Sequence, residues 1–203
     1  MSVSAVRDAA SVSAVRDLAA SAAGPFRPRR RGAGDIRWYR PVRVCHRGRM
    51  RQTVGPRRAR PEDAERIADV FLAARAGMTY LPDLHTDEET RSWIAHVVIP
   101  DDEVWVACPD GEVAAFAALG DGWLDHLYVA PEAQGRGVGA ALLALAKERR
   151  PDGLDLHVFQ ENTGARRFYE RHGFTLVELG DGGGNEENLP DARYRWRPAA
   201  RNA

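Results

Sequence analysis

A cluster of glycines between a strand-like segment and a helix-like segment restricts the fold of this chain more than any other feature. Residues 124–129 (Leu-Asp-His-Leu-Tyr-Val) are rich in strand-forming residues, Pro131 ends this run, and an Ala/Leu-rich segment begins near Gly137. Glycines at positions 135, 137 and 139 leave the turn almost bare of side chains, so backbone N–H groups can converge on an anion at the helix N-terminus. The stretch therefore predicts a strand, a pyrophosphate-binding loop and a helix.

Two familiar phosphate-binding turns do not fit this spacing. A P-loop ends in Gly-Lys-Ser/Thr, whereas Gly139 is followed by two alanines. A dinucleotide-binding turn follows the pattern G-x-G-x-x-G after a first strand, whereas this chain has G-x-G-x-G after at least two earlier strands. Asp155 lies 20 residues after Gly135, as a ribose-binding acid would, but it falls inside a predicted strand at residues 154–158.

Two motifs carry a resemblance to a known family. The pattern Gln134-x-x-Gly137-x-Gly139 resembles the acyl-CoA signature of the GNAT superfamily of N-acyltransferases. Residues 162–174 (Asn-Thr-Gly-Ala-Arg-Arg-Phe-Tyr-Glu-Arg-His-Gly-Phe) resemble that family's N-x-x-A-x-x-F-Y-x-x-x-G-F segment, at the expected distance downstream. With both motifs in order, the resemblance covers roughly residues 57–179.

The resemblance implies an α/β fold: a mostly antiparallel sheet with one parallel, splayed pair of strands, flanked by helices. The sequence pattern is compatible with this fold. Tight turns join predicted strands at 103–108, 112–119 and 124–129 into an antiparallel meander, and a helical crossover makes 154–158 parallel to 124–129. The other predicted strands are 57–60, 174–179 and 192–196, and the predicted helices start at Pro61, Thr86, Gly137 and Thr163.

The charge of the chain changes sign along its length. Residues 1–60 hold 15 Arg and 3 Asp (+12), whereas residues 61–203 hold 14 Lys or Arg and 26 Asp or Glu (−12). Residues 1–52, which contain a short tandem repeat, are expected to be a disordered tail, and residues 53–197 the N-acetyltransferase domain. The first segment also resembles a transit peptide, a nucleic-acid arm or upstream sequence before a functional start at Met50, and these readings stay open.

Composition excludes several classes of partner. The acidic domain favours an amine-bearing acceptor over nucleic acid, although an ordinary soluble surface accounts for the acidity at least as well. Cys45 and Cys108 match no metal-ligand spacing, so no metal is expected. The chain has no run of 18 apolar residues and no secretory signal, so we expect a cytoplasmic protein without a membrane partner, as a monomer or homodimer.

The resemblance also implies which residues bind the co-substrate acetyl-CoA. In the family, the pantetheine arm lies between the two splayed strands and pairs with their backbone. The pyrophosphate would rest on backbone amides from Gly135 to Ala140, with the Arg136 side chain less important, and Asn162 would hold the pantetheine amide. The expected acetyl-CoA-binding residues are Leu127, Val129, Gln134, Gly135, Arg136, Gly137, Val138, Gly139, Ala140, Asn162 and Ala165.

The catalytic candidates follow from the same resemblance. The N–H of Val129 matches the position that polarises the thioester carbonyl, and Tyr169 matches the acid that protonates the departing thiolate. Some members carry a glutamate base six residues before the Val129 position, but Trp123 stands there in this chain. Asp125, on the same strand face, is the first candidate base; His126, expected on the opposite face, is the second, and a reaction without either stays open.

The acceptor site is expected between the first two helices and their connection. Tyr80, Leu81 and Trp93 are candidate acceptor contacts, although core packing accounts for them equally well. The glycine-rich loop 180–190 is expected to expose Glu186 and Glu187, either to a substrate or simply to solvent.

These observations predict an enzyme that transfers an acetyl group from acetyl-CoA to a primary amine of a small molecule by direct attack in a ternary complex. A covalent route lacks support, because Cys108 lies away from the glycine loop. Two alternatives stay open: an enzyme acting on a protein N-terminus or lysine, and a non-catalytic acyl-CoA sensor that needs no chemistry at Tyr169.

Overall fold

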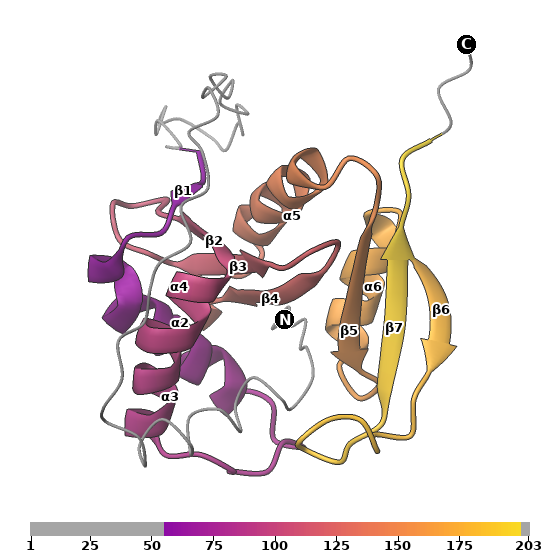
Figure 1. The fold of residues 1–203 in the computed structure, drawn as a ribbon, viewed down its shortest axis with the longest axis horizontal. Coiled ribbons are helices and arrows are strands. Elements are labelled where there is room, and N and C mark those ends of the chain that lie inside the picture. Colours follow the sequence, from indigo (N-terminus) through magenta and orange to yellow (C-terminus); the bar gives the residue numbers. More distant parts are fainter. Residues whose placement is uncertain (1–54, 200–203) are drawn as a thin grey trace.

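A computed structural model describes residues 55–199, which form two antiparallel sheets with helices packed around them (Figure 1). The predicted tail at 1–52, the predicted domain start at 53 and Met50 lie outside the described residues. The first sheet has the strand order β1-β2-β3-β4, and the second has the order β5-β7-β6. The strands are β1 (Arg57–Arg58), β2 (Glu103–Ala107), β3 (Ala115–Leu119), β4 (Leu124–Val129), β5 (Leu154–Phe159), β6 (Thr175–Leu179) and β7 (Asp191–Trp196).

The helices cover the first sheet on both faces. They are η1 (Pro61–Asp63), α2 (Ala64–Ala76), α3 (Asp87–Trp93), the π-helical turn η2 (Ile94–Val98), α4 (Ile99–Asp101), η3 (Pro131–Ala133), α5 (Val138–Arg149) and α6 (Thr163–Arg171). Tyr128 of β4 contacts Phe71 of α2, with ring centroids 4.7 Å apart, whereas the next residue, Val129, lies against Gly139 of α5. Because side chains alternate along a strand, α2 and α5 pack on opposite faces of β4, all of whose residues are buried.

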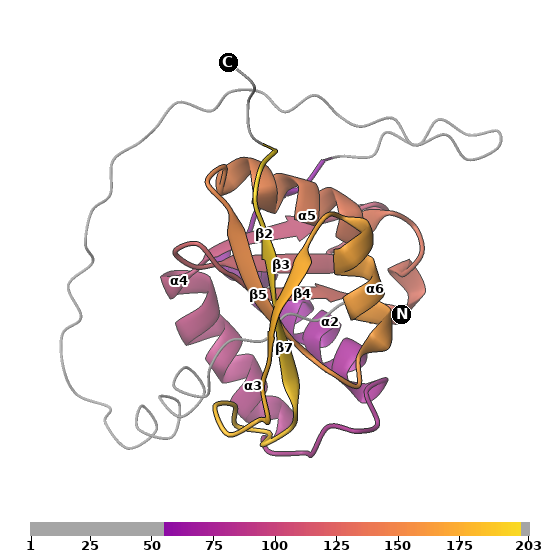
Figure 2. The same cartoon turned by 90° about the vertical axis from the view of Figure 1, so that its right-hand side faces the viewer.

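The splayed strand pair is confirmed, and it separates the two sheets. A single parallel bridge joins Trp123 to Asp155, whose N–H donates to the carbonyl of Gly122 at 3.0 Å. Beyond this bridge β4 pairs with β3, whereas β5 pairs with β7. The predicted mixed sheet is therefore divided into two antiparallel sheets that meet at one end. In the view of Figure 2 the strands of the second sheet run across those of the first.

Local signals set the helix boundaries near the predicted positions. The capping box at the start of α3 is present: Glu89 N–H donates to Thr86 Oγ1 at 3.2 Å, and Thr86 N–H donates to Glu89 Oε2 at 2.8 Å. The predicted buried face of α2, which includes Ile67, Val70 and Phe71, is buried. The helical segment that begins at α3 continues through η2 and α4, three residues beyond the predicted end at 98. No helix among residues 55–199 is long and apolar enough to cross a membrane.

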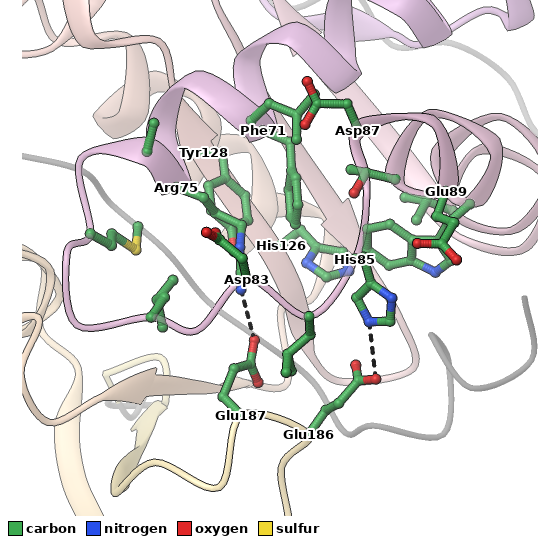
Figure 3. A pocket seen from close by; sticks show the side chains of 18 of the residues that line it. Phe71, Arg75, Asp83, His85, Asp87, Glu89, His126, Tyr128, Glu186 and Glu187 are labelled. Carbon is green, nitrogen blue, oxygen red and sulfur yellow. Dashed lines mark hydrogen bonds and ion pairs between the residues drawn. The ribbon is translucent and has the colours of Figure 1, made fainter. Parts of the chain in front are cut away.

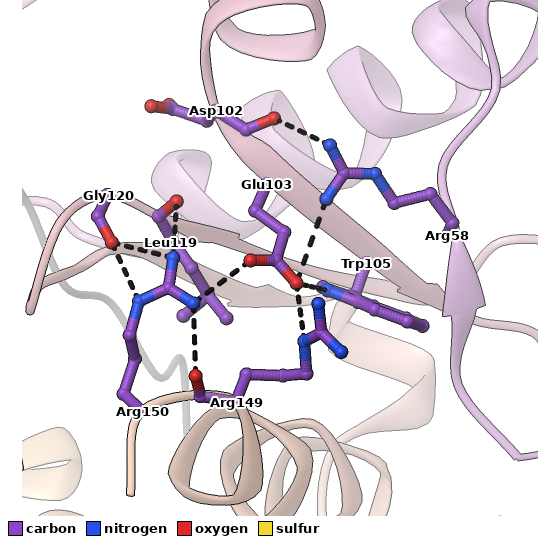
Figure 4. A network of polar contacts seen from close by, with 8 residues as sticks. All are labelled: Arg58, Asp102, Glu103, Trp105, Leu119, Gly120, Arg149 and Arg150. Atoms are coloured by element: carbon purple, nitrogen blue, oxygen red, sulfur yellow. Dashed lines mark hydrogen bonds and ion pairs between the residues drawn. The ribbon is translucent and has the colours of Figure 1, made fainter. Parts of the chain in front are cut away.

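A network around Glu103 attaches the C-terminal end of α5 to the sheet (Figure 4). The Glu103 carboxylate accepts hydrogen bonds from Arg149 at 2.7 Å, Arg150 at 2.9 Å and Trp105 at 3.0 Å. Arg150 also donates to the Gly120 carbonyl at 2.8 Å. Burial opposes ionisation here, but these hydrogen bonds hold the pKa of Glu103 below its usual value. Because α5 is one rigid element, the network also helps to fix its N-terminal end, where the glycine loop lies.

Candidate active site

The glycine loop leaves backbone donors at the start of α5. Gly135 has φ +72° and Gly137 has φ +81°, left-handed conformations that favour glycine. Gly137 is the N-cap residue and provides no side-chain cap; the first hydrogen bond of the helix runs from Ala141 N–H to Gly137 O at 3.0 Å. The N–H groups of residues 138–140 therefore have no partner within the helix, and the helix dipole favours an anion beside them.

The polar side chains of this loop are engaged with protein. Gln134 Nε2 donates to Val129 O at 3.2 Å and so supports the end of β4. Arg136 forms an ion pair with Asp110 at 2.8 Å, so its charge is already partnered. At Gly139 a Cβ atom would lie 3.2 Å from Val129 Cγ2, tighter than an ordinary contact. The anion-binding capacity of the loop therefore resides mainly in its backbone.

The N–H of Val129 faces the gap between the two sheets. Val129 pairs with Ala115 of β3, and the N–H of the following residue, Ala130, donates to Ala114 O at 2.9 Å. Since successive N–H groups of a strand point to opposite sides, that of Val129 points away from β3, toward β5. This is the direction required of a backbone group that pairs with a ligand between the splayed strands.

Two residues of the second motif carry polar atoms into the buried region at α6. Asn162 caps the helix, because its Oδ1 accepts from Ala165 N–H at 3.0 Å, and its buried side-chain amide also interacts with the Tyr80 hydroxyl. Tyr169 is 0% exposed, and its hydroxyl has no hydrogen-bond partner among residues 55–199. Sequence reasoning did not assign the cap on α6 to Asn162.

Three tyrosines from different elements lie close together. Burial raises the pKa of Tyr169 well above its ordinary value, and the neighbouring Tyr128 raises it further. Burial likewise raises the pKa of Tyr80 to about 12, with Tyr128 contributing again. Tyr128 was not singled out from sequence, although it stands inside the Leu-Tyr-Val run that precedes the glycine loop. Both phenols with raised pKa values stay protonated over the ordinary pH range.

A cavity of about 920 Å³ opens beside β4, between α2, α3 and the hairpin that joins β6 to β7 (Figure 3). Its aromatic wall consists of Phe71, Trp93, His126 and Tyr128. Leu81 and Trp93, both predicted acceptor contacts, line the cavity. Tyr80 is not among its lining residues and packs edge-on against Phe159, with ring centroids 6.0 Å apart.

Asp125 and His126 both line this cavity, so the prediction that they point to opposite faces is wrong. His126 pairs with Ala118, but Leu124 pairs with Leu119, which leaves Asp125 as an extra residue in β4. Such a bulge interrupts the alternation of side chains along a strand. Asp125 is 3% exposed and His126 is 7% exposed, and the His126 ring lies 5.3 Å from that of Trp93.

The hairpin at 180–190 closes one side of the cavity, so the prediction that Glu187 is exposed is wrong, whereas Glu186 stays partly exposed. Glu187 forms an ion pair with Arg75 of α2 at 3.0 Å, and its side chain is only 8% exposed. Glu186 lies 3.0 Å from His85 Nε2 in the loop between α2 and α3. Figure 3 shows both contacts reaching from the hairpin to that side of the cavity. Sequence reasoning missed Arg75 because its partner lies 112 residues away.

Among residues 55–199, no three His, Cys, Asp or Glu side chains form a group that could hold a metal ion.

Comparison with known proteins agrees with this architecture. Residues 100–176 match the family model for the acetyltransferase (GNAT) domain. The peptidyl-lysine N-acetyltransferase YiaC of Escherichia coli (strain K12) is 39% identical over 93 residues, which are 45% of this chain and 62% of YiaC. An uncharacterized N-acetyltransferase of Archaeoglobus fulgidus is 30% identical over 143 residues, covering 63% of this chain and 97% of that protein.

The fold is also similar to that of solved acetyltransferase structures. The structure of yncA, a putative acetyltransferase from Salmonella typhimurium with its cofactor acetyl-CoA, superposes with a TM-score of 0.56 at 19% identity, covering 70% of this chain and 92% of that one. The two motifs, the splayed strands, the glycine loop and the near-complete match to the Archaeoglobus protein lead to one conclusion. The chain belongs to the GNAT superfamily of N-acetyltransferases and is an acyltransferase.

Proposed function

We propose that this enzyme acetylates the primary amine of a small molecule, which binds as an ammonium ion in the cavity beside β4. One observation carries the proposal: the cavity combines aromatic rings with carboxylates, one of which, Asp125, lies on the strand that leads into the glycine loop. Ammonium groups are attracted both to carboxylates and to the faces of aromatic rings. A volume of about 920 Å³ is within the usual range for small-molecule sites.

The co-substrate side of the site is supported by groups that fit acetyl-CoA. The free donors at residues 138–140 suit a pyrophosphate, and the Val129 N–H and the Asn162 amide suit the carbonyl groups of a pantetheine arm. Acetyl-CoA supplies the acetyl group as a thioester, whose carbon–sulfur bond breaks as the new carbon–nitrogen bond forms. The likeness to yncA, whose structure contains acetyl-CoA, supports the same assignment.

Two of the proton transfers have candidate residues; the second proton that the nitrogen loses after the attack returns to the Tyr169 oxygen once that oxygen has protonated the sulfur. Asp125, buried in the cavity wall, takes a proton from the acceptor ammonium, and His126 lies beside it on the same wall. Tyr169 donates its phenolic proton to the departing sulfur; its raised pKa keeps that proton in place until the thiolate forms. The backbone N–H of Val129 stabilises the oxyanion that develops on the thioester carbonyl.

A lysine side chain of a protein is the second candidate acceptor. It is favoured by the name of YiaC, a peptidyl-lysine N-acetyltransferase 39% identical to this chain over 93 residues. A lysine presents the same ammonium on a flexible alkyl stem, so the cavity alone does not distinguish the two acceptors.

CoA release tests both candidates. The full chain is incubated with acetyl-CoA and pools of small amines, lysyl peptides or N-terminal peptides, and the thiol is measured with a chromogenic reagent. Release that depends on the small-amine pool supports the proposal. Release only with lysyl peptides assigns the second candidate. Release with neither the small amines nor the lysyl peptides contradicts acetylation of these amines.

A further inference from the structure

The carboxylates that line the acceptor cavity far outnumber its cations. Among residues 55–199, eight carboxylates line it, contributed by the loop after α2, by α3, by α4 and the residue after it, by β4 and by the hairpin at 180–190. In the same part of the chain, the lining residues include one guanidinium, that of Arg75. With both lining histidines neutral, the formal charge is −8 + 1 = −7. Because these acids belong to several walls, a single ammonium would lie near only a few of them.

The most available of these charges is on the hairpin. Glu187 is neutralised by Arg75, whose guanidinium is always charged. Within the described residues 55–199, Glu186 pairs with His85, which is charged only when protonated. The Glu186 side chain is 29% exposed, so a ligand can reach it. Glu186 therefore presents negative charge to the cavity, which Asp125 also lines.

The hairpin holds Glu186 in a defined place. Asn185 Nδ2 donates to Leu189 O at 2.8 Å, and Leu189 N–H donates back to Asn185 Oδ1 at 3.1 Å. Gly182 packs so closely that a Cβ there would lie 2.5 Å from the backbone of Leu189. A carboxylate held in this way needs little reorganisation to bind a cation.

A separate observation indicates that the cavity binds a polar molecule. Trp93 is 5% exposed and lines the cavity, yet its indole N–H has no hydrogen-bond partner among residues 55–199. A buried donor without a partner is costly. An ammonium group cannot satisfy it, because it has no lone pair, so the acceptor atom would be an uncharged oxygen or nitrogen elsewhere on the bound molecule. The indole ring also adds a face that attracts cations.

We propose that the acceptor is an amine that carries at least one further cationic group, and that Glu186 binds this second group while the amine to be acetylated lies beside Asp125. The inference rests on the proposed function and narrows its substrate class to oligocationic amines. A diamine or polyamine satisfies it, and so does a lysine flanked by basic residues.

The test compares four five-carbon acceptors with the full chain: pentylamine, aminopentanol, aminopentanoate and diaminopentane. We expect kcat/KM to be about tenfold higher for diaminopentane than for pentylamine, and lowest for aminopentanoate, which brings a negative charge into the cavity. Raising the salt concentration should reduce the preference for the diamine, because screening weakens charge interactions. The kcat/KM values for a lysyl peptide with neighbouring arginines and for one with neighbouring glutamates are also compared. A preference for the arginine peptide would show that the second cationic group can come from a protein acceptor.

Two matched variants locate the second charge. Glu186→Gln should lower kcat/KM for diaminopentane by about three- to tenfold and change that for pentylamine by less than about twofold. Glu88→Gln, an exposed acid of α3 outside the cavity lining, should change neither. Equal kcat/KM for the mono- and diamine, or an equal effect of Glu186→Gln on both, would overturn the inference.

Thermal stabilisation separates this inference from the proposed function. Diaminopentane should raise the melting temperature more than pentylamine does, and Glu186→Gln should remove that difference. Stabilisation by the diamine without CoA release from any amine would contradict the proposed function and support the binding specificity. No extra stabilisation by the diamine would refute the specificity even if both amines are acetylated.

Discussion

Replacing Tyr169 with phenylalanine should make the protein more stable and the enzyme slower. The hydroxyl of Tyr169 is fully buried and has no hydrogen-bond partner within residues 55–199. Burying a hydroxyl without a partner costs about 1–3 kcal/mol in proteins, and phenylalanine removes that cost while filling nearly the same volume. Tyr169→Phe should therefore raise the free energy of unfolding by about 1 kcal/mol, equivalent to about 2–4 °C in melting temperature for a domain of this size.

The effect on catalysis should have the opposite sign. Loss of a general acid lowers turnover by about a hundredfold or more, so kcat should fall to that extent while the KM for acetyl-CoA stays nearly unchanged. The assay is CoA release at saturating acetyl-CoA, with melting followed by circular dichroism on the same samples. A gain in stability together with a loss of turnover is the signature of a residue retained for chemistry.

Tyr194 provides a matched control for the same substitution. It is equally buried, but its hydroxyl donates to Glu170 at 2.7 Å and accepts from Arg166 at 3.1 Å. Tyr194→Phe should lower stability by about 1.5–3 kcal/mol, because hydrogen bonds to charged groups are lost, and should leave kcat within about twofold. If Tyr169→Phe destabilised the protein as Tyr194→Phe does, or left kcat unchanged, the role of Tyr169 as an acid would be refuted.

Three further predictions test other parts of the molecule. A hydrogen bond from Arg195 lowers the pKa of Asp155 to about 2 against the effect of burial, so Asp155 stabilises the fold above the unfolded pKa of about 3.9. Asp155→Asn should lower the free energy of unfolding, measured with urea at pH 7, by about 2 kcal/mol. The difference in stability between the variant and the original protein should vanish as the pH falls from about 4 to about 2. Gly139→Ala should raise the KM for acetyl-CoA about tenfold, because its Cβ would press on Val129, 3.2 Å away; an unchanged KM would argue against close approach at this loop. Glu187→Gln should lower stability by about 1–3 kcal/mol by leaving its buried arginine partner without a counter-charge, and should raise the KM for the amine but not for acetyl-CoA.

The parts of the fold that could be predicted are those with short-range causes. The capping box at Thr86 depends on a residue three positions away, and the left-handed turn at Gly137 depends on the absence of a Cβ. The buried face of α2 follows from helical spacing alone. Together with the resemblance of residues 162–174 to the family motif, such signals placed the glycine loop, Asn162 and Tyr169 on the elements where the structure has them.

The sequence by itself therefore determined the order of the elements, the glycine turn before α5 and the family of the protein. Only the tertiary structure decided which side chains line the cavity beside β4. Asp125 and His126 share one wall because β4 carries an extra residue relative to β3, and Glu187 reaches Arg75 because a distant hairpin folds back over α2. Both outcomes depend on pairing between segments far apart in the chain, which leaves no trace in the spacing of residues along either segment.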